Sequence, residues 1–579
     1  MHPFPSSAAR ALVFLLVLAV RPADAAVGVH VDGVDGALRE NVELRLTIRA
    51  HARDKDLDQG LVEAMHRDAP DEIREALQPY GYYNPTIETE LSGKAPDWNA
   101  RYHVEAGPQT TVRVVDLQLE GEGAMLLQPV RVAIIRTLQP GYPLSHSDYE
   151  DAKRKLASTA YAAGFLDARF THAELRVYAD ENQADIVLHY DTGTRFYFGP
   201  VTIEQDILDP DFLQRYVPIR SGEVFDPQRL LDTQFALGDL GYFASLDILP
   251  QRDPETDPDV PILIETEPRA RTRYNVGLGY GTDTGARMTL GTEVRRLNRR
   301  GHTFNAETRL SEIKNSATGE YRIPLGERPG ESIGLAGELA TEKLDSGNSR
   351  KWGLELSLSR IPGRWKRRIY IGYTHEESEL GDTLQTSDLL TPGLSLNRAD
   401  LDNPIYTRRG WSAFMDVHGA ARGVLANTSF VRTHLILKGV LPVGERARAL
   451  ARYEFGANIV EEFGELPASQ RFFAGGDQSV RGYKYQSLGP RDASGDVIGG
   501  KFLTTASIEL ERQLHRNWGV AVFGDVGGAD DDPSPKLYRG IGVGARYRAP
   551  VGSVQLDLAH PLDDPDGGIR IHLGVRVGL

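Results

Sequence analysis

The chain contains no cysteine. That absence excludes disulfide bonds, cysteine-ligated metals, thiol nucleophiles and acylation of a lipoprotein cysteine. The chain also has no uninterrupted apolar stretch of about 18 residues, which is the length that a membrane-spanning helix needs. A chain of 579 residues without these features must be stabilised by buried domain cores or by a membrane that it meets in another way.

Catalytic signatures are missing as well. The sequence has no G-x-S-x-G elbow, no H-E-x-x-H and no histidine pair at metal-ligand spacing. Two glycine-rich stretches, 277–281 and 540–544, resemble nucleotide-binding loops, but neither has the G-x-G-x-x-G spacing and neither opens a helical pattern. Both are typical of strand positions where side chains must be small. We therefore expect no active site, no cofactor and no bound metal.

The first residues have the pattern of an export signal. Arg10 precedes an apolar run over 11–20, and a small-x-small cleavage site follows at 23–25. Ten apolar residues span roughly 15 Å as a helix, about half of the hydrocarbon thickness of a membrane. The pattern predicts a signal peptide over 1–25; the alternative is a buried N-terminal helix.

Charge divides the chain near residue 268. Residues 26–268 hold 43 acidic and 22 basic side chains, whereas residues 269–579 hold 37 acidic and 42 basic ones. A folded acidic half would repel phosphate, which argues against nucleic acid as a partner. The charge boundary predicts a boundary between two kinds of domain.

Three similar segments precede this boundary, at 80–83, 163–166 and 240–243. Each has a glycine where a helix ends, followed by aromatic or apolar residues that open an alternating strand. With an earlier strand, as at 112–120 or 201–206, and two helices between, they define a β-α-α-β-β unit. This order resembles the polypeptide-transport-associated (POTRA) domain. Three periplasmic α+β copies are predicted, at 27–106, 110–195 and 198–268.

From about residue 269 the sequence consists of segments of about ten to fourteen residues that alternate apolar residues with polar residues or glycine. The last segment, 569–579, places its apolar residues on one parity and arginine, histidine or glycine on the other. A period of two with one fully apolar face indicates a strand between lipid and a wet lumen. Sixteen such segments over 270–579 predict a sixteen-stranded antiparallel transmembrane β-barrel. The alternative is a soluble β-sandwich or propeller.

A long segment between two predicted strands, 471–483, carries the most specific motif. Its Val-Arg-Gly-Tyr end resembles the loop of the POTRA-barrel outer-membrane assembly superfamily that folds back into the barrel lumen. Downstream, 523–528 resembles the F-x-D-x-G strand motif of that superfamily, and 542–552 with Asp557 resembles its closing strands. The motif residues are Val480, Arg481, Gly482 and Tyr483 in the loop and Phe523, Asp525 and Gly527 in the strand.

The three repeats, the barrel and the Arg-Phe-Phe-Ala-Gly-Gly-Asp stretch at 471–477 resemble the branch of this superfamily typified by the translocation and assembly module subunit TamA. The resemblance implies an outer-membrane location, contact with outer-membrane lipid, and insertion or translocation of autotransporters and other outer-membrane proteins. It also implies a large TamB-like partner, anchored in the inner membrane, at the POTRA arm. A phospholipid-transport role of the same complex stays open. One departure is Leu579, where many relatives end in an aromatic residue.

Strand parity places Asp525 in the lumen, because it shares the parity of Phe523 while the neighbouring valines suit lipid. A carboxylate there can accept two hydrogen bonds from a loop guanidinium, a geometry that lysine cannot reproduce. Such a charged hydrogen bond contributes roughly 1.5–3 kcal/mol. We therefore expect Arg481 to pair with Asp525. Glu509 and Glu511 are the alternative partners, and an ordinary exposed loop arginine is the remaining alternative.

A closed barrel must pair its first strand, about 272–281, with its last, 569–579. The first strand is rich in glycine, and a glycine-rich strand pairs less firmly than a β-branched one. An opened seam would expose unpaired edges that can template an incoming strand. The residues predicted to form the seam are Val276, Gly277 and Gly279 on the first strand and Leu573, Val575 and Leu579 on the last.

Three other functions predict features that differ from those of this sequence. A two-partner secretion transporter, the principal alternative, would share the barrel but have two POTRA units and an N-terminal plug helix. A porin or nutrient receptor would lack the repeats and the loop that carries Arg481. A barrel-linked hydrolase would need a catalytic domain, for which no segment remains.

Overall fold

The computed structural model describes residues 27–579 apart from 53, 55–56, 95–96, 253–257, 282–284, 327, 345–346, 381–382, 551, 565–566 and 577–579. The described residues form two compact units. One contains the first two repeats, and the other contains the barrel with most of the third repeat. The predicted signal peptide and Leu579 lie outside the described residues. No helix in the described part of the chain has the length and apolar character that crossing a membrane requires.

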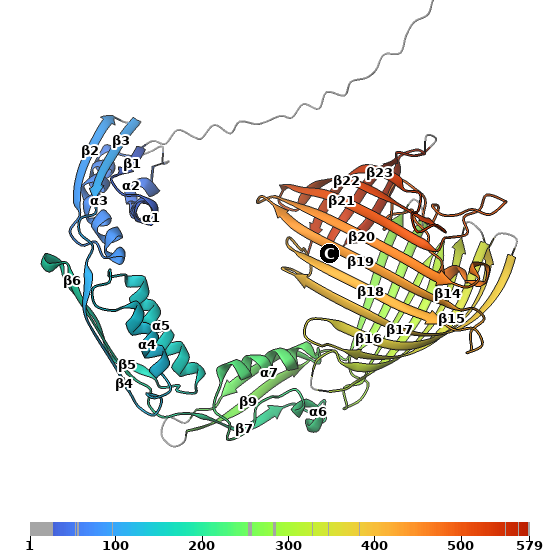
Figure 1. Ribbon diagram of the computed structural model, residues 1–579, viewed down its shortest axis with the longest axis horizontal. Coiled ribbons are helices and arrows are strands. Elements are labelled where there is room, and N and C mark those ends of the chain that lie inside the picture. Colours follow the sequence, from blue (N-terminus) through green and yellow to red (C-terminus); the bar gives the residue numbers. More distant parts are fainter. Residues whose placement is uncertain are drawn as a thin grey trace, which may run out of the picture. The chain divides into compact units, whose positions relative to one another are not determined.

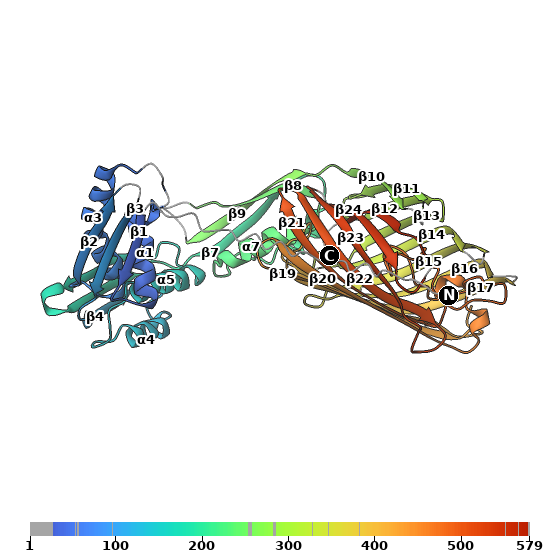
Figure 2. The same cartoon turned by 90° about the horizontal axis from the view of Figure 1, so that it is seen from above.

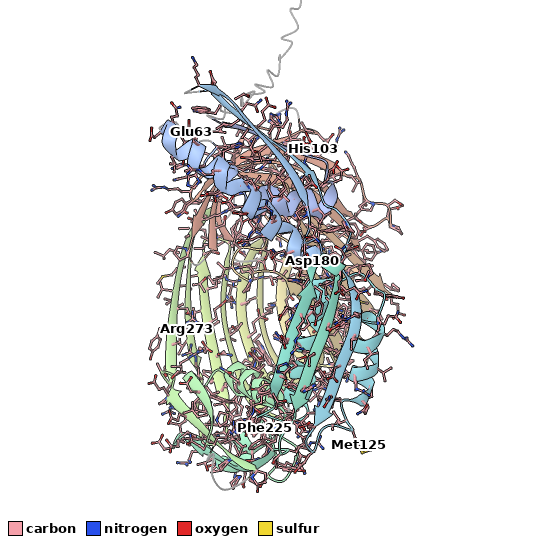
Figure 3. The ribbon with its side chains drawn as sticks, turned by 90° about the vertical axis from the view of Figure 1, so that its left-hand side faces the viewer. Glu63, His103, Met125, Asp180, Phe225 and Arg273 are labelled. Carbon is pink, nitrogen blue, oxygen red and sulfur yellow. The ribbon has the colours of Figure 1, made fainter. Side chains whose placement is uncertain are left out.

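In the first repeat a long helix, α3, covers one face of a three-stranded sheet; Glu63 lies on this helix and His103 on the sheet (Figure 3). The helix buries the apolar side chains at 62, 65, 69, 73 and 76, whose spacing of three and four residues places them on one face. The central strand pairs parallel with the first and antiparallel with the second, giving the order β1-β3-β2. The elements are β1 (Val27–Asp32), α1 (Gly36–Arg45), α2 (Thr47–Ala50), α3 (Gln59–Leu77), η1 (Gln78–Tyr80), β2 (Thr86–Lys94) and β3 (Asp97–Glu105).

The second and third repeats have the same strand order, β4-β6-β5 and β7-β9-β8. The second contains β4 (Thr111–Glu120), α4 (Gln128–Thr137), α5 (His146–Ala162), β5 (Arg169–Tyr178), η2 (Ala179–Glu181) and β6 (Gln183–Asp191). The third contains β7 (Tyr197–Glu204), α6 (Pro210–Gln214), α7 (Pro227–Asp239), β8 (Phe243–Pro250) and β9 (Asp259–Pro268). The prediction of three β-α-α-β-β units is confirmed, with the short helix α2 added in the first.

The glycines that marked the three repeats end helical segments in the left-handed conformation, with φ of +86° at Gly81, +90° at Gly164 and +76° at Gly241. One predicted strand is shifted. The strand expected at 201–206 is β7, which ends earlier because the side-chain oxygen of Gln205 accepts hydrogen bonds from the two backbone amides at 207 and 208 and closes a turn.

Sixteen described strands, β10 to β25, form an antiparallel closed barrel in which neighbours in sequence are neighbours in space (Figure 1; Figure 2). The predicted sixteen-stranded barrel is therefore confirmed. Its strands are β10 (Thr272–Gly281), β11 (Gly285–Val294), β12 (Thr303–Ser311), β13 (Lys314–Pro324), β14 (Ser332–Leu344), β15 (Gly347–Arg360), β16 (Lys366–Leu380), β17 (Thr383–Leu401), β18 (Gly410–Ala420), β19 (Phe430–Val443), β20 (Ala447–Val460), β21 (Phe502–His515), β22 (Trp518–Asp530), β23 (Tyr538–Ala549), β24 (Gly552–Pro561) and β25 (Arg570–Arg576).

Side chains on the barrel strands alternate between an exposed apolar outer face and a polar, partly filled lumen. On β22, Val520 and Val522 are exposed, whereas Phe523 and Asp525 are buried. On β25 the residues at 571, 573 and 575 are exposed and apolar, and His572 is buried. This is the alternation expected of strands between lipid and a wet interior.

The third repeat is fixed to the turn between β11 and β12. The hydroxyl of Tyr242 donates to the carbonyl of Gly301 at 2.5 Å, and the backbone amide of Asp209 donates to the carbonyl of Arg299 at 2.8 Å. Gly301 has φ of +72°, and a Cβ there would lie 2.6 Å from the ring of Phe212. Only glycine allows this close approach between the repeat and the barrel.

Candidate functional site in the barrel lumen

The long segment between β20 and β21, residues 461–501, contributes a compact apolar cluster to the barrel interior. Phe472, Val480 and Leu488 are buried together and pack against Leu503 and Ala529 on the barrel wall. The segment begins with two short helices, η3 (Phe463–Glu465) and η4 (Ala468–Gln470). Its apolar side chains are therefore a core that holds the loop against the inner wall.

Arg481 lies in this loop with its guanidinium against the wall. Its Nε donates to Asp525 Oδ2 at 2.7 Å and its Nη2 donates to Asp525 Oδ1 at 2.9 Å, which is a bidentate pair. The backbone amide of Arg481 also donates to Asp525, at 3.0 Å. Nη1 donates to Glu509 at 2.9 Å and to Asp557 at 3.0 Å. The structure thus places one arginine against three carboxylates, each of them almost fully buried.

The charge of Arg481 is strongly favoured in this position. Burial alone would lower its pKa, but the hydrogen bonds and charges of the surrounding carboxylates raise the pKa above the usual arginine value. The guanidinium carbon also lies 3.3 Å from the ring centre of Phe523, so the phenylalanine of the strand motif forms a cation–π contact with the arginine of the loop motif. The two motifs therefore meet as one site.

Charged residues that the motifs did not single out complete the site. Arg546 on β23 donates to Glu509 at 2.7 Å, to Asp557 at 2.5 Å and to Glu511 at 3.3 Å. Glu511 does not contact Arg481 directly; it accepts from Arg448 on β20 at 2.6 Å. Arg576 on β25 lies 3.6 Å from Glu509 and 3.5 Å from Glu511. We call these eight residues the lumen network: Arg448, Arg481, Glu509, Glu511, Asp525, Arg546, Asp557 and Arg576.

The lumen network holds four arginines and four carboxylates, so its charges balance. This balance matters because an unpaired charge at a buried position is costly, whereas a fully paired set is tolerated. The added members were recognisable in principle. Arg546, Arg448 and Arg576 are charged residues on the inward parity of strands whose other parity is mostly apolar. The sequence did not show which strand positions face one another.

The glycines of the 540–544 stretch make room for the loop on β23. A Cβ at Gly540 would overlap the carbonyl oxygen of Arg481, and one at Gly542 would overlap the ring of Phe523. The loop itself bends at Gly482, whose φ is +99°. The backbone amide of Gly482 donates a long hydrogen bond, of 3.5 Å, to His572 on the last strand. Gly540 therefore borders the loop, and Gly542 borders the phenylalanine whose ring contacts Arg481.

The remaining motif residues anchor the loop and the strands beside it. Val480 is fully buried. The hydroxyl of Tyr483 donates to the carbonyl of Arg539 and accepts from the amide of Asp563, both at 3.2 Å. Gly527 is on the wall, where a Cβ would lie 2.7 Å from the carbonyl oxygen of Thr504.

The described residues of the first and last strands share little main-chain pairing at the seam. Strand β10 pairs with β11 from Thr272 to Gly281, and β25 pairs with β24 from Arg570 to Arg576. Among the described residues, β10 and β25 are in register only at Gly281 and His572. A cavity of about 290 Å³ lies against the last strand, and its lining includes residues 572–576 of β25 together with loop residues.

The predicted seam residues lie on these two strands. Val276, Leu573 and Val575 are exposed on the outer face, and Gly277 and Gly279 face inward on β10. Continuing the register of the pair Gly281 and His572 along the two strands would place Leu278 opposite Val575.

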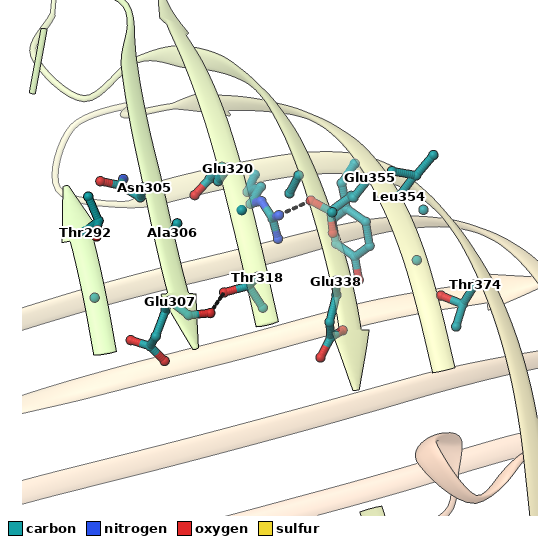
Figure 4. A pocket seen from close by; sticks show the side chains of 18 of the residues that line it. Thr292, Asn305, Ala306, Glu307, Thr318, Glu320, Glu338, Leu354, Glu355 and Thr374 are labelled. Atoms are coloured by element: carbon teal, nitrogen blue, oxygen red, sulfur yellow. Dashed lines mark hydrogen bonds and ion pairs between the residues drawn. The ribbon is translucent and has the colours of Figure 1, made fainter. Parts of the chain in front are cut away.

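On the wall over β11–β15, the described residues form separate ion pairs, such as Lys351 with Glu338 and Lys314 with Glu342. A cavity of about 560 Å³ at this wall is lined by glutamates on successive strands (Figure 4). Thr318 donates to the carbonyl of Glu307 at 3.4 Å, and Arg368 pairs with Glu355. In the described part of the chain no group of three or more histidine and carboxylate side chains is arranged to hold a metal ion.

Comparison with known proteins identifies the parts of the chain. The family model of the Omp85 superfamily domain matches residues 268–579. The model for domain 1 of the TamA POTRA domains matches 28–106, and the POTRA model described as a surface antigen variable number repeat matches 196–269.

One curated relative and two solved structures are similar to this chain. The outer membrane protein assembly factor BamA of Nitratidesulfovibrio vulgaris is 22% identical over 443 residues, covering 72% of this chain and 55% of that protein. The chain therefore spans about half the length of this curated relative. The structure of BamA from Haemophilus ducreyi lacking POTRA domains 1–3 has a TM-score of 0.64 at 16% identity and covers 80% of this chain and 98% of that one, which shows a shared fold. CdiB from Acinetobacter baumannii has a TM-score of 0.47 at 14% identity, with 82% and 91% covered.

The superfamily domain occupies more than half of the chain, and it follows repeats of which two match POTRA models. The protein therefore belongs to the Omp85 superfamily, with its barrel in the outer membrane and its POTRA domains in the periplasm.

Proposed function

We propose that this protein inserts or translocates other outer-membrane proteins, autotransporters among them, by offering the edges of its β10–β25 seam to an incoming strand. The observation that carries the proposal is the seam itself, where two strands of a closed barrel share a single registered pair among the described residues. Unpaired backbone groups at a strand edge template the addition of another strand. The printed name of the curated relative, an assembly factor, supports the same function.

Membership in the TamA branch, with a TamB-like partner anchored in the inner membrane, is part of the proposal. It is supported by the match of the first repeat to the TamA-specific POTRA model. Three repeats, where a two-partner secretion transporter is expected to have two, favour assembly over that alternative. The motif residues and the lumen network would then hold the loop inside the barrel while the seam opens.

Locking the seam tests the central step. The chain has no native cysteine, so Leu278→Cys with Val575→Cys creates the only thiol pair, across the seam. We expect oxidation to abolish the assembly of a model autotransporter in vesicles and reductant to restore it. The matched control is Leu278→Cys with Met288→Cys, which are registered partners on β10 and β11, where no opening is required. Full activity of a completely cross-linked seam would rule out lateral templating.

The partner is tested at an edge strand of the first repeat. Strand β2 lies at the edge of its sheet and exposes Glu88. A photo-crosslinking residue at Glu88 should capture a large inner-membrane-anchored protein, identified by mass spectrometry, if that partner adds a strand to this sheet. The control position is Glu63, exposed on α3. Equal capture at both positions, or none at either, would contradict docking at this edge.

A further inference from the structure

An arginine from the first hairpin spans the seam. Arg287 on β11 is the registered partner of Gly279 on β10. Its Nη2 donates to the carbonyl of Leu573 on β25 at 3.5 Å and lies 3.9 Å from Asp477 of the lumen loop. The side chain therefore passes over β10 and contacts both the last strand and the loop.

The route of this side chain depends on Gly279. A Cβ at that position would lie 2.7 Å from Nε and 3.0 Å from Cγ of Arg287. A Cβ at Gly277, two residues earlier on the same face, would meet only Thr289, at 3.6 Å, which is an ordinary contact. Gly279, unlike Gly277, therefore leaves the space that the Arg287 side chain occupies.

We propose that Arg287 is a positioning residue that couples the lumen loop to the seam by holding β10 and β25 together while Asp477 is in place. The inference rests on the proposed function, because it assigns a control element to the opening of the same seam. It follows from the single registered pair that the described residues share there: where the backbone ladder is this short, one side-chain link forms a large share of the connection. Arginine suits this role because its planar fork presents several donors in fixed directions, whereas lysine presents a single ammonium group.

When the loop moves, Asp477 moves away from the guanidinium of Arg287. The guanidinium then keeps only its contact with the carbonyl of Leu573. A half-exposed contact of this kind contributes up to about 1 kcal/mol, which corresponds to roughly a fivefold change in an equilibrium. The link is thus strong enough to bias the seam toward closure and weak enough to be released by loop displacement.

The test measures seam opening directly. Spin labels on cysteines introduced at Leu278 and Val575, in the full chain in lipid vesicles, report the separation of the two strands. We expect Arg287→Ala to increase the fraction of open seams by roughly two- to fivefold. Arg287→Lys should give nearly the same increase, because it keeps the charge but loses the fork. Unchanged distance distributions in both variants would overturn the proposal.

Two glycine variants and a double-mutant cycle distinguish the coupling role of Arg287 from general destabilisation of the barrel. Gly279→Ala should open the seam as Arg287→Ala does, and the matched Gly277→Ala should leave it closed. Combining Arg287→Ala with Asp477→Asn should add little to either change alone. Additive effects, or equal opening in both glycine variants, would contradict the coupling. The readout is independent of assembly activity, so a cross-linked seam that stays active would reject the proposed function and leave the measured link intact.

Discussion

The two edges of β25 differ sharply. On one side the strand pairs with β24 along its described length, and Arg576 and His572 on its inner face reach the lumen network and the loop. On the other side, within the part of the chain that the structure describes, it is in register with β10 at one residue. Among the described residues, the last strand is therefore held mainly by its predecessor and by side-chain contacts with the loop and the lumen network.

The largest expected effect comes from removing the arginine at the centre of the lumen network. Arg481→Ala leaves Asp525, Glu509 and Asp557 without their shared counter-ion. We expect a loss of about 3–5 kcal/mol in the free energy of unfolding, the usual cost of breaking a buried charge pair. Urea unfolding in detergent micelles measures it. Arg481→Lys should recover little, because lysine cannot form the bidentate pair.

The pairing itself is tested by a double-mutant cycle. Arg481→Ala and Asp525→Ala should each impair assembly, and the double variant should be less impaired than the sum, because each single change strands a charge. Strictly additive effects would show that the pair of Arg481 and Asp525 does not help to hold β25 on its β24 side.

Packing rather than charge is changed by Gly540→Ala. The added methyl group would overlap the carbonyl oxygen of Arg481 and displace the loop. Overpacking of this kind costs typically about 1–3 kcal/mol. Faster proteolysis of the 461–501 segment in folded barrels would report the displacement. Gly524→Ala on β22, where a Cβ meets nothing within 4 Å, is the matched control and should have no effect.

A smaller effect is expected at Asp557 on β24. Asp557→Asn keeps the shape of the side chain but weakens its hydrogen bonds to Arg481 and Arg546. We expect a loss of about 1–3 kcal/mol, measured by urea unfolding of the intact chain. If the β24 edge of the last strand were held by its backbone ladder alone, this variant would unfold like the original protein.

The smallest effect is expected at Arg576 on β25. Its side chain is 30% exposed, and its contacts with Glu509 and Glu511 are 3.6 and 3.5 Å long. Arg576→Gln should cost about 1 kcal/mol or less, as exposed ion pairs do. Spin-label distances across the seam should change little in this variant. A large opening would show that the network side of β25, and not its β10 side, controls the seam.

The order of the repeats, the bounds of the first barrel strand and the inward position of Asp525 were predictable because each depends on local periodicity. The glycine at the end of each helix and the alternation of Phe523 and Asp525 with exposed valines are signals within one segment. Arg546 and Arg448 were not singled out, although their parity was visible. Their partners lie on other strands, and Arg448 faces Glu511 only through the register of β20 with β21.

The sequence by itself determined the strands, their two faces and the loop motif, because hydrophobic alternation and turn residues act over a few neighbouring positions. The tertiary structure alone decided which charges meet in the lumen, why Gly279 differs from Gly277, and which described residues of the first and last strands are in register. These features depend on the stagger between strands that lie far apart in the chain. That stagger is set when the whole barrel closes, and no single segment encodes it.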